Sequence, residues 1–403
     1  MTEIRRVVLV VPIAPAASGN GLAMRAGMLL ETLAEEVIVD VVVVPVSGPA
    51  DDLVWARKLA RTVHVIPPVP AERAREHVTA QLADVRLRDR LERTAPMPAR
   101  TAAAPPTQAA DAIAALAPGP AHEPVAVLGM RAYLAPLATE VAHRLGAARL
   151  VIDLDDDDAA LLRARGENTE ADKFDRLGRA WLPQADAVLT ASPADAAAVG
   201  ARYGLDQVHH IPNAMRLAPY LTPPAGAARL LYVGNFTYEP NLDAATVLVE
   251  EVLPAVQQRR PDATVELVGP SIPGALDGLA TAPGVQVAGF VPDLSSSYAR
   301  AALVVVPLRH GGGTRIKVLE AFAFERAVVA TAAAVVGLDV RDGDDVVLAE
   351  TPEALAAAAV ALLDDPDRAA AIAARARQTV TDHYTLDVVG PALRAIVLSS
   401  PAP

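Results

Sequence analysis

The residues best suited to chemistry lie in one short segment of the second half of the chain, HGGGTRIKVLEA. Arg binds phosphate oxygens through two parallel hydrogen bonds, and Lys adds a compact positive charge. A run of glycines lets the backbone approach an anion closely, because no Cβ atom intervenes. The segment therefore predicts an anion site built from Gly311, Gly312, Gly313, Arg315 and Lys317.

The elements around this segment would place it where ligands of parallel sheets bind. Residues 304–306 predict a buried strand that leads into the glycines, and Thr314 is a natural N-cap for the helix that follows. Ligands of open parallel sheets bind beyond the carboxyl ends of the strands, and a helix N-terminus adds unpaired N–H groups and a positive dipole end. A nucleotide diphosphate fits this description.

The helix after the glycines has one polar face. Thr314, Lys317 and Glu320 are spaced by three, so they share a face over the first two turns, whereas most other positions are apolar. We expect this polar face to look into a cleft.

The chain is long enough for two α/β domains. It has 403 residues, 52% of them hydrophobic, and single cores stop growing near about 250–300 residues. Apolar, mostly β-branched runs alternate with helix-patterned segments in both halves, which predicts parallel sheets, although no residue-level repeat is visible. The expected strands are 7–11, 37–44, 64–66, 125–128, 150–154 and 187–190, then 230–233, 264–268, 285–287, 303–306, 328–330 and 346–348.

Proline-rich stretches mark the expected boundaries. A loop rich in proline separates residues 212–213 from a new strand at Leu230. We expect an N-terminal domain over residues 1–215, a C-terminal domain over 227–384 and a helix or tail over 385–403. Residues 96–124, rich in Pro and Ala, predict an irregular excursion that either touches a substrate or is a passive insertion.

Composition excludes several classes of protein. The net charge of −12 argues against a broad nucleic-acid surface, which needs clustered Lys and Arg. The chain has no cysteine and therefore no disulfide, catalytic thiolate or Cys-ligated metal. No run reaches the roughly 18 apolar residues of a membrane span, and Pro12 interrupts the apolar run that could pass for a signal peptide. We expect a cytoplasmic protein with no transmembrane segment and no nucleic-acid partner.

From Leu230 to Tyr384 the sequence resembles the retaining family-4 glycosyltransferases of the GT-B fold. The resemblance rests on LYVGNFTYEPNLDA at 231–244, VELVGP at 265–270, VAGFVPDL at 287–294 and VVVPLRHGGGTRIKVLEAFAFERAVVAT at 304–331, of which the last is the most specific. It implies an α/β protein with two facing Rossmann-like domains, parallel sheets and an interdomain cleft. The second domain would bind most of the donor.

The resemblance also implies an activity. A hexose-like sugar would pass from a UDP- or GDP-sugar to a hydroxyl acceptor with retention, and neither a metal nor another cofactor would be needed. The acceptor is left open among a glycan, a lipid-linked molecule and a natural product. The alternative is a catalytically silent GT-B protein that acts as a partner or activator of another transferase. A sugar-nucleotide epimerase would need acid/base pairs that the sequence does not reveal.

Three residues of the segment HGGGTRIKVLEA are expected to be catalytic: Arg315 and Lys317 from the phosphate chemistry of their side chains, with a solvated helix cation as the alternative for each, and Glu320 from the role that the resemblance assigns to it. Arg315 and Lys317 would hold the diphosphate. Glu320 would accept hydrogen bonds from the ribose hydroxyls, and a carboxylate is a suitable acceptor for a diol. The alternative for Glu320 is a structural ion pair with Lys317.

This chain departs from the family pattern in three places. Gly312 stands where the first acidic residue of the E-x7-E pattern belongs, which motivates the silent alternative. Glu325 and Ala327 replace a Gly and a Pro after the helix. Gly, Asn235 and Phe stand where many relatives place an Arg and a Lys after the first strand of the domain, so the cations on the helix gain importance.

Further donor contacts are expected from loops. The resemblance implies main-chain contacts to the base near Val291, and His310 is the histidine nearest to the expected chemistry; an exposed loop without a role is the alternative for each. Asn235, Tyr238 and Asn241 resemble a polar strand-end loop of one branch of the family and would face the cleft; turn chemistry after Pro240 is the alternative for Asn241. The small-residue loop after the first strand would approach the donor through Ser18, Gly19 and Gly21.

Charged residues of the first half are candidates for the acceptor side. VIDLDDDD at 151–158 looks like a DxD metal motif, but it follows a buried strand, and we expect no metal there. Asp153 and Asp155 would orient a loop or the acceptor hydroxyls. Arg131 stands where relatives often place a His. Arg25, in the first helix, either faces the cleft or, more commonly for an Arg, lies at the surface.

Overall fold

The computed structural model describes residues 3–69, 97–116, 123–219, 221, 226, 228–310 and 315–399. The chain divides into two compact units. Unit 1 comprises Met1–Ala17, Gly21–Pro212 and Val389–Pro403, and unit 2 comprises Ser18–Asn20 and Asn213–Val388. The change of unit after Pro212 falls close to the expected boundary, and most of the last helix belongs with the first half of the chain.

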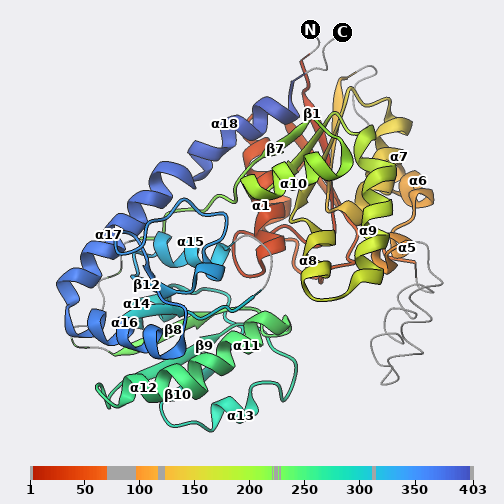
Figure 1. Ribbon diagram of the computed structural model, residues 1–403. Coiled ribbons are helices and arrows are strands. Elements are labelled where there is room, and N and C mark those ends of the chain that lie inside the picture. The colour runs from red at the N-terminus through yellow and green to blue at the C-terminus, as the bar shows by residue number, and fades with distance from the viewer. Residues whose placement is uncertain are drawn as a thin grey trace. The chain divides into compact units, whose positions relative to one another are not determined.

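Unit 1 is built on a parallel sheet of seven strands in the order β3-β2-β1-β4-β5-β6-β7 (Figure 1). All six residues of β1 are buried, as the continuous apolar run predicts for a strand covered on both faces. The strands are β1 (Arg6–Val11), β2 (Ile38–Val43), β3 (Thr62–Val65), β4 (Val125–Met130), β5 (Arg149–Asp155), β6 (Ala187–Thr190) and β7 (Val208–His210).

Helices cover both faces of this sheet, because the chain leaves β1 toward one edge and β4 toward the other, and right-handed crossovers then fall on opposite faces. Side chains from α6, α7, α9 and α10 share one core with the strands. The helices of unit 1 are α1 (Gly21–Ala34), α2 (Ala56–Leu59), α5 (Ala99–Ala103), η1 (Pro106–Gln108), α6 (Ala109–Ala115), η2 (Ala132–Leu134), α7 (Ala135–Leu145), α8 (Asp158–Ala164), α9 (Asn168–Trp181), η3 (Leu182–Gln184), α10 (Pro193–Tyr203) and α18 (Leu386–Val397).

Unit 2 repeats the architecture with six strands in the order β10-β9-β8-β11-β12-β13, all parallel (Figure 1). The strands are β8 (Arg229–Val233), β9 (Thr264–Val268), β10 (Val285–Gly289), β11 (Leu303–Val306), β12 (Val328–Ala330) and β13 (Val347–Leu348). The helices are α11 (Glu239–Val247), η4 (Leu248–Val252), α12 (Leu253–Gln257), α13 (Asp277–Ala280), α14 (Ser295–Arg300), α15 (Ile316–Ala323), η5 (Ala332–Ala334), α16 (Pro352–Asp364) and α17 (Pro366–His383).

The expected strands are confirmed, four of them to the residue (187–190, 264–268, 303–306 and 328–330) and the others within two positions at each end. Two expectations were wrong. The edge strand β7 was missed, because three residues give no measurable alternation. Residues 97–116 are not irregular, because they form α5, η1 and α6. The small side chains of Ala103, Ala104, Ala109 and Ala112 in this stretch are buried.

The amino ends of the two sheets carry the same buried ion pair, although no residue-level repeat is visible in the sequence. In unit 1, Arg6 starts β1 and donates to Asp40, the third residue of β2, at 2.8 Å. In unit 2, Arg229 starts β8 and donates to Glu266, the third residue of β9, at 2.9 Å. Both carboxylates are fully buried. Arginine and hydroxyl partners lower the pKa of each carboxyl against the opposing effect of burial.

In the described part of the chain, no helix combines the length and apolar character that crossing a bilayer requires.

Candidate functional site

The order of strands in unit 2 reverses between β8 and β11, which lie side by side. At such a point the connections leave in opposite directions, and a crevice opens beyond the carboxyl ends of the two strands. The loop after β8 begins with Gly234, and its backbone lies against Gly269, the residue after β9. A Cβ atom on Gly269 would stand 1.8 Å from the Gly234 carbonyl oxygen, and φ at Gly269 is +142°. Only glycine fits there, so this edge is tightly built.

Helix α15 starts in this crevice, one residue later than expected. It begins at Ile316, and Arg315 holds the N-cap position without a side-chain cap bond. The predicted N-cap Thr314 lies outside the described residues, as do Gly311, Gly312 and Gly313. Arg315 is 7% exposed. The start of α15 thus has a cation where capping residues usually carry a hydroxyl or a carboxylate.

Lys317, on the first turn of α15, has polar but uncharged partners. Its Nζ donates to Asn241 Oδ1 at 2.5 Å and lies 5.4 Å from the centre of the Tyr232 ring. No carboxylate forms an ion pair with Lys317 within the residues that the structure describes. Burial lowers the pKa of Lys317 to about 7, and the positive charge of Arg315 adds to this effect. Two cations therefore lie close enough to repel one another at the start of α15.

Glu320 lies one turn further along α15. Its Oε2 accepts a hydrogen bond of 3.2 Å from the Tyr298 hydroxyl, and the residue is 7% exposed. Glu320 and Lys317 form no ion pair with each other, so the structural alternative for Glu320 does not hold. Burial raises the pKa of Glu320 to about 7, against the lowering effect of the Tyr298 hydrogen bond.

The other expected donor contacts of unit 2 lie in loops at the carboxyl edge. Asn235 is half-buried after β8, where its carbonyl accepts from Asn241 at 2.9 Å and its Oδ1 accepts from Thr237. His310 is exposed after β11 and lies 3.1 Å from Glu239. Val291 is half-buried after β10. Asn235 therefore serves turn chemistry and also braces Asn241, the partner of Lys317.

The turn after α15 passes through Glu325. Glu325 adopts φ = +53°, a left-handed conformation that favours glycine. Arg326 supports it by donating to the carbonyls of Phe324 and Glu325, which end the helix, and to that of Tyr298. The turn is thus built with a residue in a left-handed conformation and a buried arginine.

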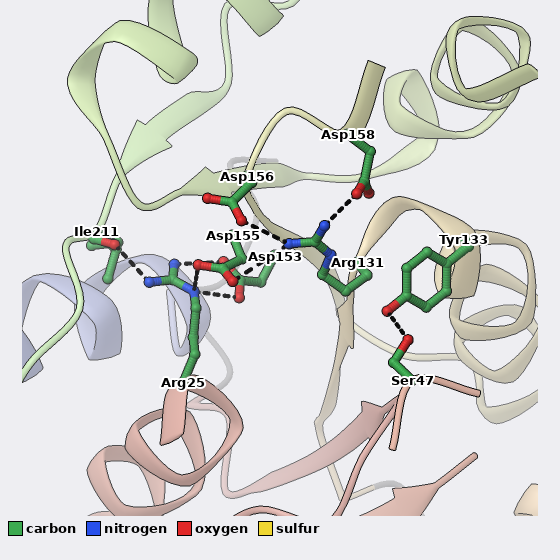
Figure 2. A network of polar contacts seen from close by, with 9 residues as sticks. All are labelled: Arg25, Ser47, Arg131, Tyr133, Asp153, Asp155, Asp156, Asp158 and Ile211. Atoms are coloured by element: carbon green, nitrogen blue, oxygen red, sulfur yellow. Dashed lines mark hydrogen bonds and ion pairs between the residues drawn. The ribbon is translucent and has the colours of Figure 1, made fainter. Parts of the chain in front are cut away.

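Unit 1 brings the expected acceptor-side residues together in one cluster at the carboxyl ends of β4 and β5 (Figure 2). Arg25, from α1, donates two hydrogen bonds of 2.8 and 2.6 Å to Asp153 and one of 3.1 Å to the Ile211 carbonyl. Neither Arg25 nor Asp153 has an exposed side-chain surface. The surface position expected for Arg25 was wrong, because a buried carboxylate requires a cation. Of the two roles expected for Asp153, the structure favours orientation of the surrounding chain.

Arg131 and Asp155 form the outer part of this cluster (Figure 2). Arg131 pairs with Asp155 and Asp156, each at 3.4 Å, and with Asp158. Both Arg131 and Asp155 have left-handed backbones, with φ of 72° and 62°. Burial, with the charge of Asp156, raises the pKa of Asp155 to about 7 against the effect of Arg25 and Arg131. The acidic run thus surrounds arginines.

The small-residue loop after β1 is exposed. Ser18 and Gly19 precede α1, and Gly19 has φ = +98°. Gly21 is the first residue of α1.

Two residues of the candidate site, Tyr232 and Tyr298, were not predicted from the sequence, and neither was the pairing of Arg25 with Asp153. Tyr232 lies beside Lys317, Tyr298 donates to Glu320, and Arg25 neutralises Asp153. Tyr298 and Glu320 are 22 positions apart on different helices, and no periodicity connects them. For Arg25 the sequence did offer a signal. An arginine in the mostly apolar helix α1 needs a partner, because burying an unpaired charge is costly.

The fold class is shown by solved structures that cover nearly the whole chain. HepE from Anabaena, solved in complex with UDP and glucose, is 15% identical with a TM-score of 0.65, over 96% of this chain and 97% of that one. Sucrose-phosphate synthase from Thermosynechococcus elongatus is 20% identical with a TM-score of 0.68, over 96% and 97%. TarM from S. aureus, solved with fondaparinux, alpha-GlcNAc-glycerol and UDP, is 10% identical with a TM-score of 0.71, over 98% and 100%. The chain has the GT-B fold, with two Rossmann-like parallel-sheet domains.

A family match covers part of the second unit. Residues 227–365 match the family described as glycosyl transferases group 1. This segment contains the described carboxyl edge of the second sheet with Arg315, Lys317 and Glu320. No curated protein matches the chain significantly in sequence.

Proposed function

We propose that this protein transfers a hexose-like sugar from a UDP- or GDP-sugar to a hydroxyl acceptor with retention of configuration, as its resemblance to family-4 glycosyltransferases implies. One observation carries the proposal: two cations, Arg315 and Lys317, lie together near the buried carboxylate of Glu320 at the reversal point of the sheet. A diphosphate would relieve the repulsion between the cations, and a ribose diol would supply donors for the carboxylate. The family match over residues 227–365 supports the same assignment.

The chemistry needs no metal in this proposal. The acceptor oxygen attacks the anomeric carbon from the face on which the diphosphate leaves. The bond between carbon and phosphate oxygen breaks, and the acceptor proton passes to a phosphate oxygen of the leaving group. Arg315 and Lys317 stabilise the negative charge that develops on the diphosphate, and Glu320 fixes the nucleoside. The acceptor, which is a glycan, a lipid-linked molecule or a natural product, would lie against unit 1.

A donor-hydrolysis assay tests the activity without knowledge of the acceptor. The full chain is incubated with a panel of UDP- and GDP-sugars in EDTA, and free nucleotide is measured. We expect slow release of UDP or GDP from one donor, since transferases leak sugar to water, and loss of release in Lys317→Ala. Binding of nucleotide without any turnover, including with acceptor mixtures, would favour the silent partner instead. Turnover that EDTA abolishes would contradict the metal-free mechanism.

A further inference from the structure

The carboxylate of Glu320 accepts a hydrogen bond from one aromatic side chain. Tyr298, on α14, is fully buried, and its hydroxyl donates to Glu320 Oε2 at 3.2 Å. Oε1 of Glu320 accepts no hydrogen bond from the residues that the structure describes. A carboxylate that is bound on one oxygen by a fixed donor has a defined orientation, and its second oxygen is left for a ligand.

Tyr298 itself is fixed at both ends. Its ring stacks on Phe324 with the centroids 4.2 Å apart and the planes at 10°, and its carbonyl accepts from Arg326 at 2.7 Å. The helix that carries it is anchored independently, since Ser297 and Arg300 both donate to the buried carboxylate of Glu266. The hydroxyl therefore points at Glu320 because of its surroundings and not because of a ligand.

We propose that Tyr298 is a positioning residue for nucleoside recognition: its hydroxyl orients the buried carboxylate of Glu320, so that this carboxylate can accept the ribose hydroxyls of the donor. This inference rests on the proposed function, since it takes Glu320 as the ribose acceptor. Tyr298 touches Glu320 and acts through it.

The electrostatics agree with this role. Burial raises the pKa of Glu320 to about 7, and the hydrogen bond from Tyr298 lowers it. The charged groups around this part of α15 include Arg315 and Lys317 at its start, Glu325 and Arg326 after its end, and Arg377 on α17, which donates to the Ala323 carbonyl and lies 3.6 Å from Glu325. The strand β12, which contacts α15, contributes no charged residue. Loss of the hydroxyl would therefore leave Glu320 protonated at neutral pH, and a carboxylic acid accepts fewer hydrogen bonds than a carboxylate.

The experiment is a pH series of UDP and GDP affinities on the full chain, by calorimetry between pH 6 and 8.5. In the wild type we expect affinity to fall on the acid side as Glu320 takes up a proton. Tyr298→Phe keeps the ring and its stack and should shift this acid limb to higher pH, with affinity reduced about tenfold at pH 7. In a Glu320→Gln background, where residue 320 no longer titrates, Tyr298→Phe should have little further effect.

The matched control is Tyr203→Phe in unit 1, which removes another phenol that donates to a carboxylate, Asp175, at 3.0 Å. It should leave the pH profile unchanged. If Tyr298→Phe melts below the assay temperature, Phe324→Leu keeps the hydroxyl, loosens the stack, and should shift the acid limb in the same direction by less.

Two results would overturn the proposal in different ways. If Tyr298→Phe retains the wild-type profile, or weakens binding by the same factor in the wild-type and Glu320→Gln backgrounds, Tyr298 has only a structural role. If wild-type protein binds no nucleotide, or Glu320→Gln binds like the wild type, the assignment of the ribose site fails and the inference fails with it.

Discussion

The two sheets are alike at their amino ends and different at their carboxyl ends. At the amino ends, Arg6 with Asp40 and Arg229 with Glu266 form the same buried ion pair at the same register. At the carboxyl ends, unit 1 has arginines surrounded by aspartates, whereas unit 2 has Lys317 without an ion-pairing carboxylate in the described chain. The paired charges of unit 1 are accounted for by folding, whereas the unpaired charge at the carboxyl end of unit 2 indicates a ligand of opposite charge.

This comparison teaches where function departs from the shared scaffold. A buried charge with its counter-charge is explained by folding alone. Lys317, next to a second cation, is explained when a diphosphate is added. Substitutions test this difference. Those in the charged cluster of unit 1 should change stability, and those at the cations of unit 2 should change nucleotide binding.

The largest effect is expected from the buried pair of unit 1. Arg25→Met leaves Asp153 as a buried charge with its bidentate partner removed, which should lower the free energy of unfolding by about 3–5 kcal/mol. Chemical denaturation measures this change. Arg25→Met with Asp153→Asn should recover most of the loss. The control Arg144→Met removes an exposed pair with Glu140 and should change stability by about 0.5 kcal/mol or less. An equal loss of stability in Arg25→Met and Arg144→Met would contradict the stabilising role of the buried pair.

The second prediction concerns the cations of unit 2. Arg315→Ala and Lys317→Ala should each remove a charge-assisted contact worth about 1.5–3 kcal/mol. Turnover and nucleotide affinity should fall by ten- to a hundredfold or more, while the apo stability of Lys317→Ala is kept or increased. Arg375→Ala, which removes an exposed cation paired with Asp344 in the same unit, should have wild-type activity. Wild-type turnover in both site variants would show that Arg315 and Lys317 do not bind the diphosphate.

The third prediction separates binding from folding at Glu320. Glu320→Gln exchanges a charged acceptor for a neutral one of the same shape, so nucleotide affinity should fall by about 1–3 kcal/mol. The melting temperature without ligand, measured at pH 6 where Glu320 itself is mostly protonated, should barely move. A variant that melts much earlier without ligand, yet gains the wild-type shift from nucleotide, would rule out the ribose role.

The smallest effect is the pH dependence that Lys317 brings. Its pKa of about 7 makes the empty site hold a neutral amine above that pH, although a diphosphate binds the charged form. Binding above pH 7 must therefore take up a proton, and affinity should fall by up to about tenfold per pH unit as pH rises. Calorimetry in two buffers of different ionisation enthalpy at pH 8 measures the uptake. Lys317→Arg stays charged and should lose this limb, whereas no uptake in the wild type would contradict the account.

Local sequence patterns were enough to predict two α/β domains with parallel sheets, and the GT-B fold was implied by the family resemblance. Buried strands such as 7–11 and 303–306 are continuous apolar runs, which fix their type and nearly their bounds. The polar face of α15 followed from the spacing of Lys317 and Glu320. The alanine helices at 97–116 were not predictable, because proline at their ends suggests loops and alanine gives no amphipathic pattern.

The partners of the site residues could not be predicted in the same way. Asn241 was expected either to face the cleft or to serve a turn, and it is the hydrogen-bond partner of Lys317, 76 positions away. Tyr298 and Phe324 meet although they belong to different helical segments. Such contacts depend on how α11, α14 and α15 pack on one sheet, which no single-segment pattern specifies.

The most direct test of the central claim is a crystal structure of the full chain with UDP or GDP in the presence of EDTA. We expect the diphosphate to contact Arg315 and Lys317 at the carboxyl edge between β8 and β11, with the ribose hydroxyls on Glu320 and no metal ion between phosphate and protein. A nucleotide bound away from this edge, or one held through a metal by the acidic run of unit 1, would contradict the account.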